Sequence, residues 1–557
     1  WMIFLFACLA PLNVVARFSP SPGYRMWSFD SLGASSVNGT QRTLVNVNHE
    51  SFVSFVNNRA GELPYTLLFP SVLGETLECD VVPAFLAPGL LEKYPSLVSW
   101  TGLCKGRSSV SLTYNLNVPG SLSTTFFKDG QVVRVELDKK SSDAALYTIR
   151  RYADSEVSPD FQFITKEPPK FNDEAALFSN FLSGGRHLDQ ALTGLPVPPN
   201  VDKAYKFRIA FLVTDNFVAK LQAQGYATAT KVDVIGYLSE ILARLNGIFM
   251  RELGVFFELI ADSEKLICLS NVPAGCGNWA PAGTTTSGNL LDRVGEIIED
   301  EGVLSTDYEI SHALYDVNNQ FGVAWMGAVC RGNVTLRSGV SGVGTLNIDL
   351  KSDSFVVDLF AHEVGHQLLG SHTFDFCPDN PNYEDGFNFG PYSIPATAYE
   401  PGSGVTIMSY TGICGANGDV QQDSDPYFHS TSLLQMRAFV ERQVNFAGCP
   451  NETIAISIAK PTLQVEVPDQ NGTPTCTVPV GNFVQLTGQV LNPDNTATYY
   501  YTWERFDSQE NTNYQVRANP RFMTQTPRAD QPIRYLPNLY LATYPNVLAS
   551  QLEEIFP

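Results

Sequence analysis

Three of the seven histidines in this chain lie within eleven residues, at His362, His366 and His372, and Glu363 follows the first of them. Residues four apart stand on one face of a helix, so His362 and His366 can share a metal ion. His372 joins them if the helix ends and the chain turns back. Three nitrogen ligands with an open position are typical of catalytic zinc, and a neighbouring carboxylate can take a proton from water on the metal. The spacing therefore predicts one catalytic Zn2+ with Glu363 as general base.

The composition of the 557 residues excludes several classes of protein. Hydrophobic residues make up 44% and charged residues 17%, which argues against disorder and allows roughly two to four domains with real cores. The formal net charge of −21 would repel nucleic acids and anionic membrane surfaces, so neither is expected as a partner.

Several features indicate an extracellular location. The ten cysteines are scattered without a CxxC pair, which indicates disulfides formed in an oxidising compartment. Residues 1–17 resemble a signal peptide, although they lack an initial Met and a positively charged start, so we expect a truncated N-terminus. The apolar run is too short for a membrane anchor, so stable membrane insertion is not expected. Glycosylation sequons, which fit a secreted glycoprotein, occur at Asn38, Asn333, Asn451 and Asn471.

Changes of pattern divide the rest of the chain. Residues 18–165 contain alternating, strand-like stretches and are predicted to form a β-rich domain. Residues 166–203 are rich in proline and have the composition of a linker, where a processing protease would cut. Residues 204–450 alternate strands with helices, which indicates an α/β domain with a mixed sheet. Residues 451–557 lose the helical pattern and are expected to form a β-sandwich, which could continue past Pro557.

Periodicity in the α/β domain predicts the elements that must position the histidines. A helix at 354–368 carries the first two histidines, and the apolar stretch 321–329 is expected to be the strand nearest to them. The other strands are predicted at 206–213, 254–260 and 308–315, and the other helices at 230–250 and 288–300.

The histidine motif, followed by Thr406-Ile407-Met408-Ser409-Tyr410, resembles the metzincin zinc endopeptidases. The sequences His372-Thr373-Phe374 and Pro426-Tyr427-Phe428-His429 look like the reprolysin-like branch found in many secreted bacterial proteins. The resemblance implies that the three histidines bind zinc and that Met408 supports their imidazoles from below without binding the metal. Tyr410 matches a tyrosine that in some metzincins binds the resting zinc or stabilises the transition state. The alternative for Tyr410 is a packed turn residue.

The resemblance extends to both flanks. Leu90 to Gly102 looks like the propeptide of such proteins, so residues 18–165 are expected to be the propeptide of a zymogen. Thr487 to Trp503 looks like an immunoglobulin- or cadherin-like module. Some metzincins are kept latent by a propeptide cysteine on the zinc, but here we expect a Cys79–Cys104 disulfide instead. In the catalytic domain we predict Cys330–Cys449 and Cys377–Cys414.

One position departs from the metzincin pattern. A glycine normally stands seven residues after the first histidine, where the chain leaves the helix, and Leu369 occupies that position here. A turn with positive φ costs a residue other than glycine about 1 kcal/mol or more. We expect the helix to run one residue further, so that Gly370 makes the turn. The alternative is a strained Leu369.

Other polar residues have less specific signals. His312 and His429 are expected to be structural histidines, although either could help to shape the site. The acidic loop with Asp375, Asp379 and Asp385 is a candidate Ca2+ site, and solvated carboxylates are the alternative.

These observations favour a secreted, zinc-dependent endopeptidase that acts on proteins or peptides. The first alternative is a pappalysin-like metzincin, which shares the His-Glu-Val-Gly-His start and the His-Thr-Phe end. The Thr-Ile-Met-Ser-Tyr turn favours the reprolysin-like branch. The alternative from another class is a surface adhesion protein that uses a catalytically silent metalloprotease fold as a scaffold.

Overall fold

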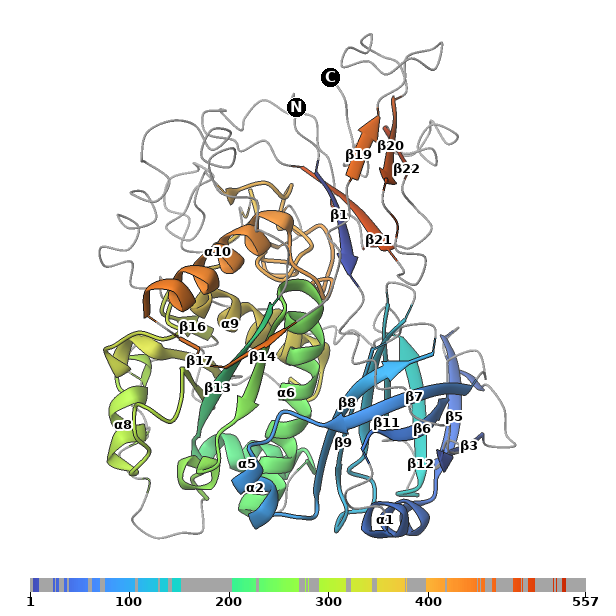
Figure 1. Cartoon of the computed structure of the whole chain (residues 1–557), viewed down its shortest axis with the longest axis vertical. Coiled ribbons are helices and arrows are strands. Elements are labelled where there is room, and N and C mark those ends of the chain that lie inside the picture. Colours follow the sequence, from blue (N-terminus) through green and yellow to red (C-terminus); the bar gives the residue numbers. More distant parts are fainter. Residues whose placement is uncertain are drawn as a thin grey trace.

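The computed structural model describes two large bodies and several C-terminal strands (Figure 1). With short internal gaps, the described residues are 24–151, 203–269, 290–316, 322–342, 348–375 and 397–455, together with strands at 4–9, 463–466, 484–490, 499–505 and 533–536 and the single residues 276, 279, 377, 491, 493, 524 and 527. Each large body has its own hydrophobic core.

The N-terminal body is an 11-stranded sheet, as its alternating sequence predicts. The strands follow the order β2-β6-β7-β8-β9-β10-β11-β12-β5-β3, and β4 pairs with β5. Helix α1 (His49–Asn58) buries Phe52 and Phe55 in the core of this sheet, and α2 (Pro88–Lys93) lies between β7 and β8 in the chain. The strands are β2 (Tyr24–Arg25), β3 (Trp27–Phe29), β4 (Ser35–Val37), β5 (Thr40–Val47), β6 (Tyr65–Pro70), β7 (Thr76–Pro83), β8 (Leu97–Cys104), β9 (Ser109–Asn115), β10 (Ser123–Lys128), β11 (Gln131–Leu137) and β12 (Leu146–Arg151).

The second body confirms the predicted α/β class with a mixed sheet. Its strands follow the order β14-β13-β15-β17-β16, and β18 pairs with β13. The first four are parallel, whereas the edge strand β16 and strand β18 are antiparallel to their partners. The strands are β13 (Lys203–Val213), β14 (Val255–Leu259), β15 (Ile310–Tyr315), β16 (Gly322–Ala324), β17 (Ser338–Gly342) and β18 (Glu452–Ala455).

Helices pack on this sheet and build its main core. The longest, α6 (Lys231–Leu253), begins where the Thr230 side chain accepts from the Asp233 backbone N–H, and it ends at Gly254 with φ 64°. Its apolar stripe, predicted at 230–250, packs into the core with the helix that carries the histidines. The other helical segments are α5 (Asp215–Ala223), η2 (Ser263–Leu266), α8 (Val294–Asp300), η3 (Val334–Arg337), η4 (Ser354–Ala361), α9 (His362–Gln367) and α10 (Ser430–Ala447). No helix in the described part of the chain is long and apolar enough to cross a membrane.

Two predicted elements are shorter than expected. The strand predicted at 321–329 covers only Gly322–Ala324, because Gly327 and Cys330 adopt positive φ angles that no strand can hold. The helix predicted at 288–300 is regular only over Val294–Asp300.

The C-terminal strands do not complete a sandwich within the described residues. Strands β19 (Leu463–Glu466), β20 (Val484–Val490) and β22 (Ile533–Leu536) form an antiparallel three-stranded sheet. Strand β21 (Tyr499–Glu504) pairs instead with β1 (Phe4–Leu9), which lies in the signal-like segment (Figure 1). The immunoglobulin-like module and the domain boundaries therefore remain predictions, and the linker 166–203 lies outside the described residues except for its last residue.

Four disulfides are present in the described chain. The three predicted pairs, Cys79–Cys104, Cys330–Cys449 and Cys377–Cys414, are confirmed. A fourth pair, Cys268–Cys276, was not predicted. Because Cys79 is bonded to Cys104, neither offers a thiolate for a latent metal site.

The N-terminal body adds main-chain hydrogen bonds to the edge of the α/β sheet. The Ala87 N–H donates to Leu259 O at 3.0 Å, and the Leu259 N–H donates to Phe85 O at 2.9 Å. Leu90, from α2, is fully buried in the core of the α/β body. Residues 85–90 thus cover the open edge of β14, which would otherwise expose unpaired backbone groups.

A buried charge network joins the same two bodies behind the histidine helix. Arg134 of β11 is 2% exposed, and its guanidinium donates to Asp353 at 3.1 Å and to Lys351 O at 3.0 Å. Arg244 of α6 also donates to the Asp353 carboxylate. Burial alone would raise the pKa of Asp353, but the two guanidinium groups hold it below its ordinary value. Asp353 directly precedes η4, so this network anchors the start of the helix that leads to the histidines.

We predict that Arg134→Leu lowers the free energy of unfolding of the chain by about 3 kcal/mol, because it leaves part of a buried ion-pair network without its partner. Urea denaturation followed by fluorescence measures this loss. Arg150→Leu is the matched control, since Arg150 pairs with Glu136 at a more exposed position and should change stability by less than about 1 kcal/mol. Equal losses in the two variants would contradict a special role for Arg134.

Candidate metal centre and substrate pocket

The helix that carries the histidines changes its winding just before them. Residues Ser354–Ala361 form a π-helix, and His362–Gln367 continue it as an α-helix. The predicted helix at 354–368 is thus present. π-helical segments are rare and are frequent at functional sites. Phe355, Val356 and Phe360 bury one face of the helix in the main core, so the other face is held toward the pocket.

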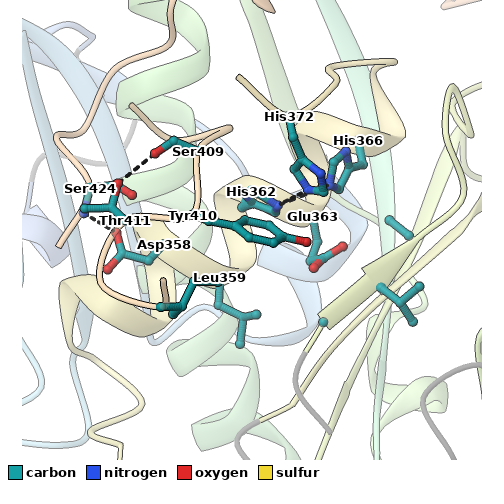
Figure 2. Close-up of a pocket in the computed structure, with 14 residues that line it drawn as sticks. Asp358, Leu359, His362, Glu363, His366, His372, Ser409, Tyr410, Thr411 and Ser424 are labelled. Atoms are coloured by element: carbon teal, nitrogen blue, oxygen red, sulfur yellow. Dashed lines mark hydrogen bonds between the residues drawn. The ribbon is translucent and has the colours of Figure 1, made fainter. Parts of the chain in front are cut away.

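The three histidines converge on one point. Their Nε2 atoms lie 3.1 Å apart for His362 and His372, 3.1 Å for His362 and His366, and 3.0 Å for His366 and His372. Nitrogens bound to a tetrahedral zinc at about 2.0–2.1 Å lie about 3.3 Å from one another, so the triangle fits such an ion. Among the described residues this is the one group whose side chains can jointly bind a metal. Figure 2 shows the imidazoles facing each other.

Hydrogen bonds orient two of the rings. His362 Nδ1 lies 2.7 Å from Ile407 O, and His366 Nδ1 lies 2.7 Å from Gly370 O. A carbonyl accepts only, so each Nδ1 carries the proton and each Nε2 offers a lone pair. Burial lowers the pKa of His362 to about 4 and that of His366 well below its ordinary value, which keeps both rings neutral. Lone pairs this close repel one another, so the donor set fits a bound cation.

The turn after the helix corrects one prediction. Leu369, not Gly370, adopts the left-handed conformation, with φ 76°. The Gly370 N–H bonds to Gly365 O at 2.8 Å, and a Cβ on Gly370 would lie only 3.0 Å from that oxygen. Glycine is therefore needed at 370 for close approach, while Leu369 bears the strained φ and packs its side chain against the main core. The turn still places His372 beside the other two histidines.

Met408 lies directly beneath the helix and is fully buried. A Cβ on Gly365 would overlap Met408 Sδ, so the glycine between the two helical histidines lets the methionine approach. The neighbouring Ile407 carbonyl orients His362, and Met408 O accepts from the Thr373 N–H at 3.1 Å. The geometry suits the support that the resemblance implies for Met408, and the role remains a proposal.

Glu400 stabilises this turn through hydrogen bonds, and no sequence motif predicts its role. Its buried carboxylate accepts from the backbone N–H groups of Val405 at 2.9 Å and Thr406 at 3.1 Å, and from the hydroxyls of Thr406 and Thr373. It therefore ties the methionine turn to the chain that follows His372. A lone glutamate in a loop has no motif, so only its burial beside Thr373 in the folded chain identifies it.

Glu363 lies in the pocket beside the triad. Its Oε2 is buried and has no hydrogen-bond partner among the described residues. Burial raises the pKa of Glu363 well above its ordinary value. A Cβ on Gly322 of the edge strand β16 would overlap Glu363 Oε1, so glycine at 322 makes room for the carboxylate. Figure 2 shows Glu363 below the imidazoles and close to Tyr410.

Tyr410 lines the same pocket and is also packed. Its ring lies 4.5 Å from the ring of His372 and stacks on Phe374 at 4.3 Å between centroids. The position suits either a role at the metal or a packing role, so its function remains a proposal.

The other polar residues that were candidates for the site contact neighbouring side chains or backbone groups of the protein. His312 Nδ1 lies 2.9 Å from Gln367 Oε1, and His312 Nε2 lies 2.9 Å from Ser341 Oγ, as expected for a structural histidine. His429 stacks on Tyr399 and lies 3.7 Å from Glu504. Asp375 is buried, accepts from the Gly402 N–H at 2.7 Å and pairs with Arg505. Asp379 and Asp385 lie outside the described residues, and nothing in the described part supports the Ca2+ prediction.

The strain at Leu369 leads to a stability prediction. Leu369→Gly and Leu369→Ala both remove the packed side chain, but only glycine relieves the positive φ. The free energy of unfolding should therefore be about 1 kcal/mol higher for the glycine variant than for the alanine variant. Thermal denaturation of the two proteins measures the difference. At a position with ordinary backbone angles, an alanine variant is more stable than a glycine variant. If Leu369→Ala is the more stable variant here, the backbone at residue 369 is not strained.

Comparison with known proteins agrees with this geometry. Residues 222–435 match the family model of the reprolysin-like metallopeptidases of family M12B. The solved structure of metalloproteinase-II from Bacteroides fragilis is similar at 9% identity and a TM-score of 0.33, over 70% of this chain and 94% of that chain. A structure titled as a chaperone–substrate complex is similar at 11% identity and a TM-score of 0.22, over 43% of this chain and 38% of that one. At these TM-scores neither structure bears on function. No curated protein matches the chain.

Proposed function

Because residues 222–435 belong to the reprolysin-like metallopeptidases of family M12B, we propose that this protein is a secreted, zinc-dependent endopeptidase. The observation that carries the proposal is the convergence of three neutral imidazoles, with Nε2 atoms 3.0–3.1 Å apart, beside an unpartnered carboxylate. The proposed zinc ligands are His362, His366 and His372. Four disulfides suit an extracellular protein.

The residues around the triad have distinct tasks in peptide hydrolysis. When bound, zinc supplies Lewis acidity, which lowers the pKa of water and polarises the peptide carbonyl. Glu363 accepts the proton of the attacking water and later delivers it to the leaving amine. Its enclosed position beside the triad, with one oxygen that has no hydrogen-bond partner among the described residues, suits a group that must hold a proton between these two steps. We assign Tyr410 to the carbonyl oxygen of the substrate and Met408 to the support of the rings, because the Tyr410 ring lies 4.5 Å from that of His372 and Met408 is buried against the helix.

The edge strand β16 supports cleavage inside a polypeptide. It pairs with β17 on one side and lines the pocket that contains the triad. An extended substrate of any sequence can pair with such an edge through main-chain hydrogen bonds. Its chain can then continue on both sides of the triad, as cleavage within a polypeptide requires.

We further propose that residues 18–165 are a propeptide that is released by cleavage in the linker 166–203. Among the described residues, the pocket is lined only by residues of the α/β body. A propeptide that keeps the enzyme latent would therefore have to act through residues outside the described part, or through the buried charge network around Asp353. The cysteine on zinc that keeps some metzincins latent is not available from Cys79 or Cys104.

Glu363→Ala should keep the metal and lose proteolysis. Removing the general base lowers kcat by about 100- to 10,000-fold. Zinc content, measured by atomic absorption, should stay at about one ion per chain, because the three histidines remain. Cleavage of casein and of a mixed peptide library reports the activity, and chelation with 1,10-phenanthroline should abolish it in the wild type. Zinc-loaded wild type without any cleavage would support the silent scaffold, and full activity after chelation would exclude the metal mechanism.

Gly322→Ala should displace the Glu363 carboxylate, because the new Cβ overlaps its Oε1 atom. A displacement of about 1 Å lowers kcat by about 10- to 100-fold while zinc content and thermal stability stay close to wild type. Gly332→Ala is the matched control, since a Cβ there meets no atom within 4 Å. Steady-state kinetics on one fluorogenic peptide compares the variants, and an unchanged kcat in Gly322→Ala would argue against Glu363 as the base.

A further inference from the structure

The pocket of the triad has a second polar end formed by Asp358. This residue lies four positions before His362, in the π-helical segment that leads into the histidine helix, and it lines the same pocket. Figure 2 shows Asp358, Ser409, Thr411 and Ser424 grouped near the main chain of Tyr410, away from the imidazoles.

The Asp358 carboxylate keeps one oxygen unpaired. Its Oδ1 accepts from the Ser424 N–H at 3.0 Å, and the Ser424 hydroxyl also contributes a hydrogen bond to this carboxylate. Oδ2 is buried and has no hydrogen-bond partner among the described residues. Ser409 donates to Thr406 O and Thr411 donates to Gly404 O, so the protons of these two hydroxyls are used within the turn.

The pocket also offers no cation of its own to Asp358. No lysine or arginine is among the described residues that line it, and Asp358 forms no ion pair in the described part of the chain. Burial raises the pKa of Asp358 well above its ordinary value, and the negative charge of Asp423 raises it further. An unpaired carboxylate in such surroundings gains most from a positively charged partner.

The pocket also has apolar lining residues. Among them are Leu359 and Ile413, together with Val323 and Ala324 of the edge strand. A lysine or arginine side chain combines an apolar stem with a charged end and therefore suits a pocket with such a lining and a buried carboxylate. A purely apolar side chain would leave Oδ2 unpaired.

We propose that Asp358 selects substrates with lysine or arginine next to the scissile peptide bond, by binding the cationic end of that side chain. The inference rests on the proposed peptidase function for its substrate, but the cation site itself does not need catalysis. Asp358 acts as a specificity residue: its Oδ2 accepts from the ammonium or guanidinium group while Oδ1 keeps the Ser424 N–H.

The first test measures specificity. Cleavage of a mixed peptide library by the full chain, read by mass spectrometry, should show lysine or arginine enriched at one position beside the cleaved bond. For two peptides that differ only by lysine or norleucine at that position, kcat/KM should favour lysine by at least about 30-fold, because a desolvated charge pair is lost with norleucine. A ratio below about threefold in the wild type would overturn the proposal.

Asp358→Asn keeps the shape of the side chain and an acceptor for the Ser424 N–H. It should reduce the lysine-to-norleucine ratio to near one while kcat/KM for the norleucine peptide changes by less than about threefold. Asp316→Asn is the control, since Asp316 lies outside the pocket lining and pairs with Lys220 at 3.7 Å. It should keep the ratio within about threefold of wild type. A ratio that persists in Asp358→Asn would contradict the proposal.

A binding measurement separates this inference from the proposed function. Agmatine, a four-carbon amine that carries a guanidinium group, should bind the wild type in calorimetry and bind Asp358→Asn at least about tenfold more weakly. If the zinc-loaded protein cleaves no peptide but binds agmatine in this way, the peptidase proposal fails and the cation site stands. If it cleaves peptides but neither prefers lysine nor binds agmatine, the cation site is wrong and the peptidase proposal stands. If Asp358→Asn does not fold, the wild-type lysine ratio and agmatine binding decide.

Discussion

The approach of three imidazole nitrogens to within 3.0–3.1 Å of one another is the constraint on which the rest of the site depends. Three neutral rings with lone pairs aimed at one point do not remain together by their own attraction. The surrounding chain must therefore hold them, and a cation at the centre reverses the repulsion. The close contacts at Gly365 and Gly370, and the positive φ of Leu369, all belong to this arrangement.

The support of the site comes from several parts of the chain. Asp353, held by Arg134 and Arg244, anchors the start of the histidine helix from behind, and Arg134 belongs to the N-terminal sheet. Met408 packs against Gly365 in the middle of the helix, and Glu400 joins that turn to the chain after His372. Asp353 and Glu400 are bonded within their networks, whereas Asp358 and Glu363 each keep one oxygen without a hydrogen-bond partner beside the pocket. Unpaired carboxylate atoms thus lie in the part of the fold that is open to a substrate.

Much of the architecture was predictable because it is encoded locally. The apolar stripe of α6, the alternating strands of the N-terminal sheet and the i, i+4 histidines follow from the periodicity of helices and strands. The three predicted disulfides are present, although cysteine spacing alone does not determine which cysteines pair. The apolar pattern at 321–329 predicts a longer strand than β16, because apolar content does not reveal the positive φ angles of Gly327 and Cys330.

By itself, the sequence determined the chemistry of the site, since residue types and their spacing decide which side chains can share a metal and which carboxylate lies beside it. Only the tertiary structure decided how the site is held and what else faces it. Glu400 lies 28 residues after His372, and Gly322 lies 40 residues before His362. Asp358 lies within the helix without any motif, and the roles of all three residues arise from contacts formed on folding. The left-handed conformation of Leu369 is also decided by the tertiary structure. Packing of the Leu369 side chain against the main core, and the placement of His372 that the turn allows, offset the cost of the positive φ.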